Sequence, residues 1–190
     1  MFRFDFADTI TAAVLLAMVA VAAVSDIRRR KIPNWLTLGG MAGGLVLQTV
    51  LHGLAGLLHS AEGLALGFGV YLAFYCLRAM GAGDVKLMAA VGAIAGPALW
   101  FQMFVATSVT AGVLALGLSL ATGRLRQTVW NMAYIVMELM HFRAPYFRHP
   151  ELDVKHGRAL KMPHALAIAA GVAACVLLPG ARFNLSRLLA

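Results

Sequence analysis

The stretch VKLMAAVGAIAGPALWFQMFVATSVTAGVLALGLSL, residues 85–120, runs for 36 residues with a single charged side chain, Lys86. At about 1.5 Å per residue, one helix of this length would extend roughly 54 Å, whereas the hydrocarbon core of a bilayer is about 30 Å thick. Gly96-Pro97 lies near the middle, and proline cannot donate the hydrogen bond that would continue a helix. The stretch therefore predicts two short membrane-spanning helices, at 85–96 and 98–120.

The composition of the whole chain agrees with this prediction. Of its 190 residues, 61% are hydrophobic before the 19 glycines are counted, 13% are charged, and the mean hydropathy is +0.81. Ordinary soluble domains are about 45–50% apolar with glycine included, and about 25% charged. Because the apolar residues come in solid blocks and do not alternate with polar ones, the pattern also excludes a membrane β-barrel. We expect a single all-α membrane domain over residues 1–190.

Further apolar runs at about 9–25, 35–51, 62–77 and 164–178 complete the expected set of spans. Together with 85–96 and 98–120 they predict a six-transmembrane-helix bundle. The second and third spans carry small residues at the spacing that lets helices approach closely in lipid. These residues are Gly39, Gly40, Gly43, Gly44, Gly63 and Gly67.

One long hydrophilic connection, about 121–162, separates the fifth and sixth spans. Within it a polar stripe recurs at helical spacing among apolar residues, formed by Gln127, Asn131, Tyr134 and Glu138. The segment is short for a span, so it predicts an interfacial helix on the cytoplasmic surface, with a seventh span as the alternative. His141, His149 and His156 follow, without the spacing or the cysteines of a zinc site, and we expect no metal site in this chain.

The basic residues predict the orientation in the membrane. The net charge is +8, and thirteen of the sixteen lysines and arginines fall in three connections: after the first span, between the third and fourth, and between the fifth and sixth. Only Arg3, Arg182 and Arg187 fall on the other side. Because basic residues remain cytoplasmic, both termini are expected outside the cytoplasm. The positive charge therefore indicates membrane topology, and we expect no nucleic-acid partner.

Two aspartates differ from the other acidic residues in their placement. Asp26 directly follows the apolar run of the first span, where a carboxylate opposes the helix dipole. Asp84 ends Gly81-Ala82-Gly83-Asp84 and begins the fourth span, where capping of the helix is the alternative role. The first span runs toward the cytoplasm and the fourth leaves it. The topology therefore predicts both carboxylates at the same depth on the cytoplasmic face.

Two carboxyl groups that meet in a poorly hydrated site share one proton, because adjacent negative charges cannot both be desolvated. The ionised group can then take a proton from water while the protonated group polarises a peptide carbonyl. That is aspartic-peptidase chemistry, and it needs no cofactor. Gly81 and Gly83 would permit backbone angles that other residues resist, and would leave room for an extended substrate.

Three segments of this chain resemble the type IV prepilin peptidases, the GxGD membrane aspartic peptidases. Gly81-Ala82-Gly83-Asp84-Val85-Lys86-Leu87 is similar to their GxGDxKL signature. Ser25-Asp26, the basic run 28–31 and Ile32-Pro33-Asn34 resemble the family's first-aspartate segment. Residues 161–171, KMPHALAIAAG, resemble its last-helix segment, although the family usually has an aromatic residue and a glycine where this chain has His164 and Ala165 after Pro163.

The resemblance implies a membrane endopeptidase of the bacterial inner membrane. Such an enzyme removes the short basic leader of prepilin or pseudopilin substrates at the cytoplasmic face, with Asp26 and Asp84 as the catalytic pair. Gly81, Gly83, Lys86, Pro33, Asn34 and Pro163 would support the substrate and the motif. The larger members carry paired CxxC zinc motifs and also N-methylate the product. This chain lacks those motifs and resembles the short, peptidase-only members that serve tight-adherence (Flp) pili, so the pilus-assembly machinery is a further candidate partner.

Two other functions are compatible with these residues. A small transporter could use Asp26 and Asp84 as proton-coupling carboxylates, but corresponding broken helices in two halves would then be expected, and no internal repeat is visible. A structural subunit of a secretion machine would use both aspartates as helix caps only. In that protein, single Asp→Asn changes would be nearly harmless.

Overall fold

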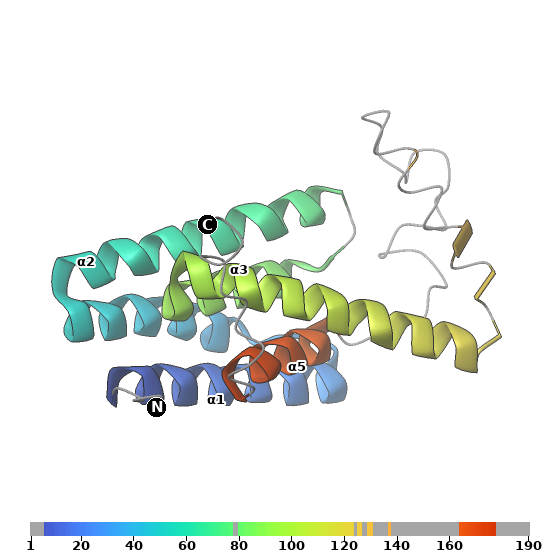
Figure 1. Ribbon diagram of the computed structural model, residues 1–190, viewed down its shortest axis with the longest axis horizontal. Coiled ribbons are helices and arrows are strands. Elements are labelled where there is room, and N and C mark those ends of the chain that lie inside the picture. The colour runs from blue at the N-terminus through green and yellow to red at the C-terminus, as the bar shows by residue number, and fades with distance from the viewer. Residues whose placement is uncertain are drawn as a thin grey trace, which may run out of the picture.

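The computed structural model describes residues 6–77, 80–123, 125–126, 129–130, 137 and 164–177. Four helices make up the described part: α1 (Phe6–Arg29), α2 (Asn34–Cys76), α3 (Ala82–Ala121) and α5 (His164–Leu177) (Figure 1). Three of them, α1, α2 and α3, are long and apolar enough to cross a membrane. The all-α membrane fold is therefore confirmed. The count of six spans stays a prediction, and the interfacial helix falls almost entirely outside the described residues.

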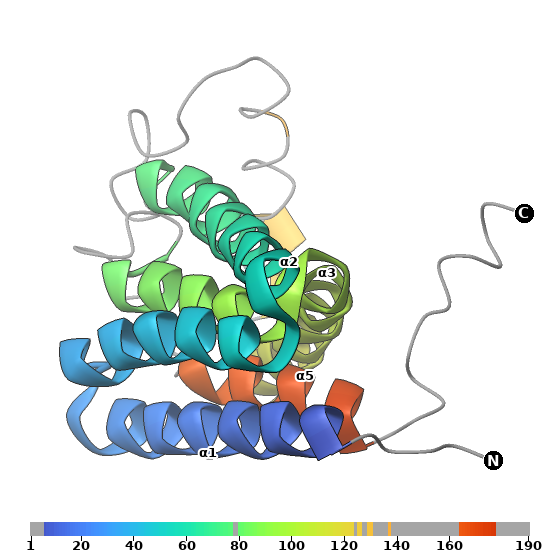
Figure 2. The same cartoon turned by 90° about the vertical axis from the view of Figure 1, so that its left-hand side faces the viewer.

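Helices α2 and α3 each fold back on themselves (Figures 1 and 2). The bends lie at Gly53 (φ 64°, ψ −146°) and Gly96 (φ 75°, ψ 172°), whose positive φ values favour glycine. Gly96 is where the sequence predicted a break. In α2 the helix resumes directly after Gly53, whereas the sequence predicted a new span only from 62. His52, His59 and Ser60 interrupt the apolar run there without interrupting the helix.

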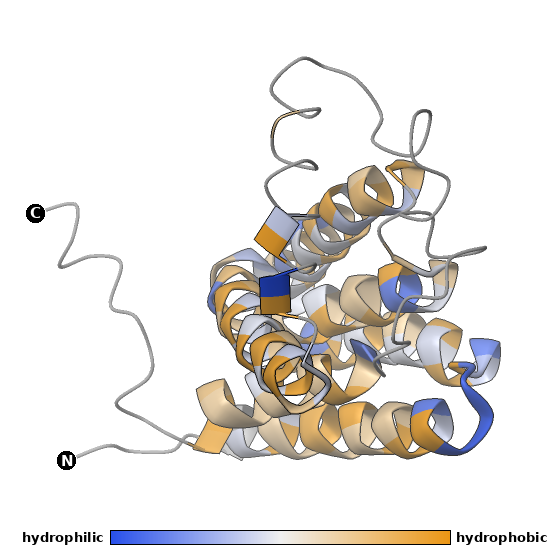
Figure 3. Cartoon of the chain, turned by 90° about the vertical axis from the view of Figure 1, so that its right-hand side faces the viewer, coloured by the Kyte–Doolittle hydropathy of each residue, from blue (hydrophilic) through white to orange (hydrophobic). Residues whose placement is uncertain are grey.

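The α1–α2 link and the α2–α3 link lie at one end of the bundle, and the bends of α2 and α3 lie at the other end (Figures 1 and 2). The link between α1 and α2 is strongly hydrophilic, whereas the helices are mostly apolar (Figure 3). The end of α1 and the beginnings of α2 and α3 are thus brought together. This arrangement agrees with the prediction that Asp26 and Asp84 lie at the same end.

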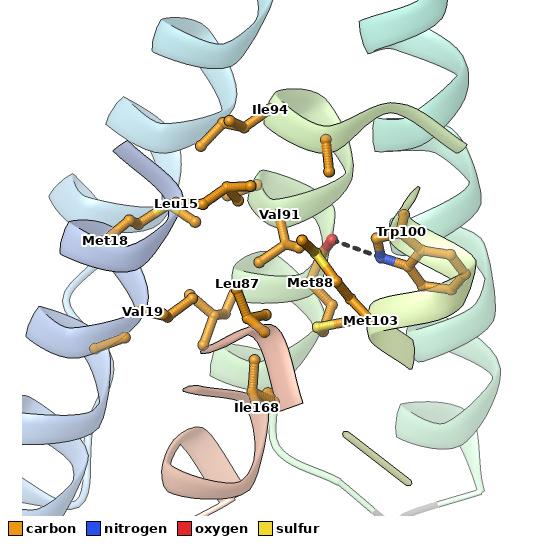
Figure 4. Close-up of a cluster of buried hydrophobic side chains, with 14 of the residues drawn as sticks. Leu15, Met18, Val19, Leu87, Met88, Val91, Ile94, Trp100, Met103 and Ile168 are labelled. Carbon is orange, nitrogen blue, oxygen red and sulfur yellow. Dashed lines mark hydrogen bonds between the residues drawn. The ribbon is translucent and has the colours of Figure 1, made fainter. Parts of the chain in front are cut away.

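The centre of the bundle is the first segment of α3, Ala82–Gly96. It contacts both halves of α2 as well as α1 and α5, and every residue from Leu87 to Gly96 is buried. Leu15 and Val19 of α1 and Ile168 of α5 pack on this segment (Figure 4). Small residues such as Ala89, Gly92 and Ala93 let neighbouring helices approach this segment closely, which favours its central position.

Glycines allow α2 to pack closely on this central segment. A β-carbon on Gly63 would overlap the backbone of Gly92, and one on Gly92 would overlap the backbone of Gly63. Gly40, Gly44 and Gly67 also face close neighbours, as the spacing predicted. The prediction is wrong for Gly39 and Gly43, which face open space.

Candidate active site

Asp26 lies in the last turn of α1, because the helix continues past the predicted end at 25 to Arg29. Arg28 and Arg29 favour this extension, since cations are stabilising at a helix C-terminus. Arg30 ends the helix with a left-handed backbone (φ 51°), and its amide N–H donates to the Asp26 carbonyl oxygen at 2.8 Å. The half-buried Asp26 side chain is therefore carried by a regular helical turn.

Asp84 is the third residue of α3, which begins at Ala82 after Gly81. Its Oδ2 accepts a hydrogen bond from the Gly81 backbone N–H at 3.2 Å, as an acidic residue at this position of a helix commonly does. The side chain is only 8% exposed. The alternative role predicted for Asp84 is capping of the helix. The N-cap residue is Gly81, three positions earlier, although Asp84 does accept a hydrogen bond from a backbone N–H at the helix start.

The two carboxylates interact electrostatically with one another across α1 and α3. Helix α5 contacts both of them: the Ala165 backbone N–H donates to Asp26 Oδ2 at 3.3 Å, and the His164 side chain interacts electrostatically with Asp84. Three helices that are distant in sequence thus converge on one acidic pair. The backbone N–H groups of the first turn of α5 supply positive potential to it.

The predicted support residues Asn34 and Lys86 are also brought together. Lys86 Nζ donates a hydrogen bond to Asn34 Oδ1 at 3.0 Å and ties the start of α3 to the start of α2. Pro33 precedes α2, and its carbonyl oxygen accepts the backbone N–H groups of Leu36 and Thr37 at 3.2 and 3.3 Å. The motif residues of the two predicted segments therefore form one connected structure beside the aspartates.

Of the two reasons expected for the motif glycines, the one that concerns unusual backbone angles is wrong. Gly81 has φ −83° and ψ 154°, an extended conformation that any residue adopts, and Gly83 lies within α3. What both positions provide is space. A β-carbon on Gly81 would lie 3.5 Å from Asp84 Oδ2, and one on Gly83 would lie 3.4 Å from the Ile32 Cβ. Larger side chains at these positions would crowd the carboxylate and the α1–α2 link.

Two residues near the pair were not predicted as site residues. His164 stands directly after Pro163 at the start of an expected span, and its place at the predicted cytoplasmic end of that span could have identified it. Tyr71 of α2 is 2% exposed, packs edge-on against Trp100 and Phe104, and interacts electrostatically with Asp84. Nothing in its sequence context distinguishes Tyr71 from an ordinary core aromatic residue.

Other expectations about the site concern residues that the structure leaves undescribed. Pro163, the remaining predicted support residue, lies outside the described residues, as do His141, His149 and His156. In the described ranges, no cluster of three or more His, Cys, Asp or Glu side chains could hold a metal ion.

The fold and the site define a class: a helical membrane protein with a pair of interacting aspartates at one end of its bundle. A model of the type IV leader peptidase family matches residues 13–116, more than half of the chain, and the chain belongs to this family. The matched region includes both aspartates and ends before α5. Searches of curated proteins and of solved structures give no match. The protein is therefore a member of a membrane peptidase family with protein substrates.

Proposed function

We propose that this protein is an aspartic endopeptidase that removes the basic leader from prepilin or pseudopilin substrates at the cytoplasmic face of the bacterial inner membrane. Membership of the leader peptidase family supports the general activity. The single observation that carries the assignment of the catalytic pair is geometric: Asp26, in the last turn of α1, and Asp84, in the first turn of α3, lie at the same end of the bundle. A transporter that uses the same carboxylates is disfavoured by the family.

The pair performs the chemistry by holding one proton between two carboxyl groups. The ionised carboxylate takes a proton from a water molecule, whose oxygen attacks the carbonyl carbon of the scissile peptide. The protonated carboxyl donates to the carbonyl oxygen as negative charge develops on it. The tetrahedral intermediate then collapses, the C–N bond breaks, and the leaving nitrogen receives a proton from the pair.

The substrate reaches this pair from the hydrophilic end of the bundle. Gly81 is exposed beside the Asp84 carboxylate, so an extended peptide can approach without meeting a side chain there. The substrate's leader would lie in the cytoplasm, while its apolar helix stays in the bilayer. The thirteen basic residues that precede or follow predicted spans on this side support the same orientation, with both termini periplasmic.

The test is co-expression with prepilins from the same genome, with leader removal scored by the mass of the product. Cleavage by the wild-type chain and none by Asp26→Asn or Asp84→Asn is the expected result. Glu62→Gln is the matched control, because it removes a carboxylate from an exposed position on α2. The product mass also tests the expected lack of N-methylation, since a methylated product would be heavier by one methyl group. Full cleavage by either aspartate variant would refute the proposal.

A further inference from the structure

The start of α5 brings a third ionisable side chain to the aspartates. The Ala165 N–H···Asp26 Oδ2 hydrogen bond of 3.3 Å joins this end of α5 to the pair, so the position of the preceding residue, His164, is constrained relative to both carboxylates. His164 is half-buried and interacts electrostatically with Asp84.

Other cationic groups near the pair are hydrogen-bonded elsewhere or exposed to solvent. From α3, the Lys86 ammonium donates to Asn34. From α1 and its link, Arg28, Arg29 and Lys31 are exposed. From α2, the buried Tyr71 adds a phenol, whose charged form would be anionic. His164 thus differs from its neighbours in being able to place a positive charge that the pair shares.

We propose that His164 is a positioning residue of this site: its imidazolium stabilises the ionised carboxylate of the Asp26–Asp84 pair and thereby sets the pH range of activity. This role rests on the proposed function. Loss of the positive charge makes ionisation of the pair less favourable. The singly ionised, active form of the pair then requires a higher pH, and the acid limb of the activity profile moves upward.

The pH dependence of kcat/KM for leader cleavage tests the proposal. His164→Gln and His164→Phe should retain activity at their optimum, but their acid limb should move to higher pH by about one unit, the lower end of the shift that one nearby opposite charge commonly produces at a carboxyl group. His164→Lys keeps the charge and should keep the wild-type limb. If all three variants showed the same acid limb as the wild type, the proposal would be overturned and the peptidase assignment would remain intact.

A second measurement does not depend on peptidase activity. Diethylpyrocarbonate modifies neutral imidazoles, and mass spectrometry gives the rate at each histidine. Asp84→Asn removes a carboxylate that attracts a proton to this end of α5, so His164 should be modified several-fold faster in Asp84→Asn than in the wild type at neutral pH. The exposed His52 and His59, at the other end of the bundle, serve as internal controls. Equal rates at His164 in both proteins would overturn the proposal even if the wild-type chain cleaves no prepilin.

Discussion

The two ends of the central segment of α3, Ala82–Gly96, differ in how their polar groups are hydrogen-bonded. At the bend, Pro97 lacks an N–H and Gly96 leaves the helical conformation, so the carbonyl groups of Ala93 and Ile94 need other donors. Two side chains of α2 provide them: Ser60 Oγ donates to the Ala93 oxygen at 2.5 Å, and Gln48 Nε2 donates to the Ile94 oxygen at 2.6 Å. At the bend, side chains therefore donate hydrogen bonds to backbone carbonyl groups.

At the aspartate end, backbone N–H groups donate hydrogen bonds to side-chain carboxylates. The amide of Gly81 donates to Asp84 and the amide of Ala165 donates to Asp26. Gln48 and Ser60 are 6% and 0% exposed. Asp84 is similarly buried at 8%, but Asp26 is half-buried and Gly81, beside Asp84, is exposed. The polar groups at the bend are therefore enclosed and structural. Those at the aspartate end are held in place but remain accessible, as a reaction centre requires.

The largest expected effect lies at the aspartate end. Asp26→Asn and Asp84→Asn should each lower cleavage by at least about 10³-fold, because removing either carboxyl removes a proton donor or acceptor from the reaction. The free energy of unfolding should change by less than about 1 kcal/mol, since asparagine can still accept the single backbone hydrogen bond. Activity and denaturant unfolding in detergent measure the two quantities. A large loss of stability in either variant would mean that the aspartates are mainly structural.

The next largest effect is expected where α2 packs closely on the middle of the central α3 segment, at Gly63 and Gly92. Gly63→Ala should lower the free energy of unfolding by about 3 kcal/mol, near the upper limit for an overpacked core, because the new methyl group meets the Gly92 backbone. Gly43→Ala is the matched control on the same helix, where open space surrounds the position. Equal stabilities of the two variants would show that α2 and α3 are not in close contact at Gly63.

At the bend, loss of the side-chain donors should reduce stability without a specific effect on catalysis. Gln48→Leu and Ser60→Ala each leave a buried carbonyl group without its donor, at a cost of about 1–3 kcal/mol. The remaining folded protein should cleave with wild-type kcat/KM. Thr49→Ala is the control, because its hydroxyl donates within its own helix, to the Leu45 carbonyl oxygen. If Gln48→Leu or Ser60→Ala lost activity at unchanged stability, the conclusion that the bend is only structural would be wrong.

The smallest expected effect concerns the contact between the two motif segments. Lys86→Met removes the hydrogen bond to Asn34 and should lower kcat/KM by about tenfold or less, since a hydrogen bond to a charged group that is open to solvent contributes about 1–1.5 kcal/mol. Asn34→Ala should have the same effect, and the double variant should lose no more than either single one. Additive losses would show that Lys86 and Asn34 act separately.

The aspartate end could be predicted from sequence better than the bend. Asp26 and Asp84 stand out because carboxylates are rare in an apolar chain, and the topology implied by the basic residues places them at the same end. Gln48 lies within the predicted span 35–51 and Ser60 in the connection that follows it, and nothing local indicates which carbonyl groups they meet. Their role depends on a contact between segments more than 30 residues apart, which periodicity does not report.

The sequence by itself determined the all-α membrane class, the break at Gly96-Pro97 and the two acidic positions, because each depends on composition or on immediate neighbours. The tertiary structure decided that α3 begins with the most deeply enclosed segment, that Gly40 packs and Gly39 does not, and that α5 brings His164 and the Ala165 amide to the aspartates. These features depend on which face of each helix meets its neighbour. In a chain that is apolar on nearly every face, hydrophobic pattern cannot identify that face, so side-chain size and the pairing of buried polar groups do.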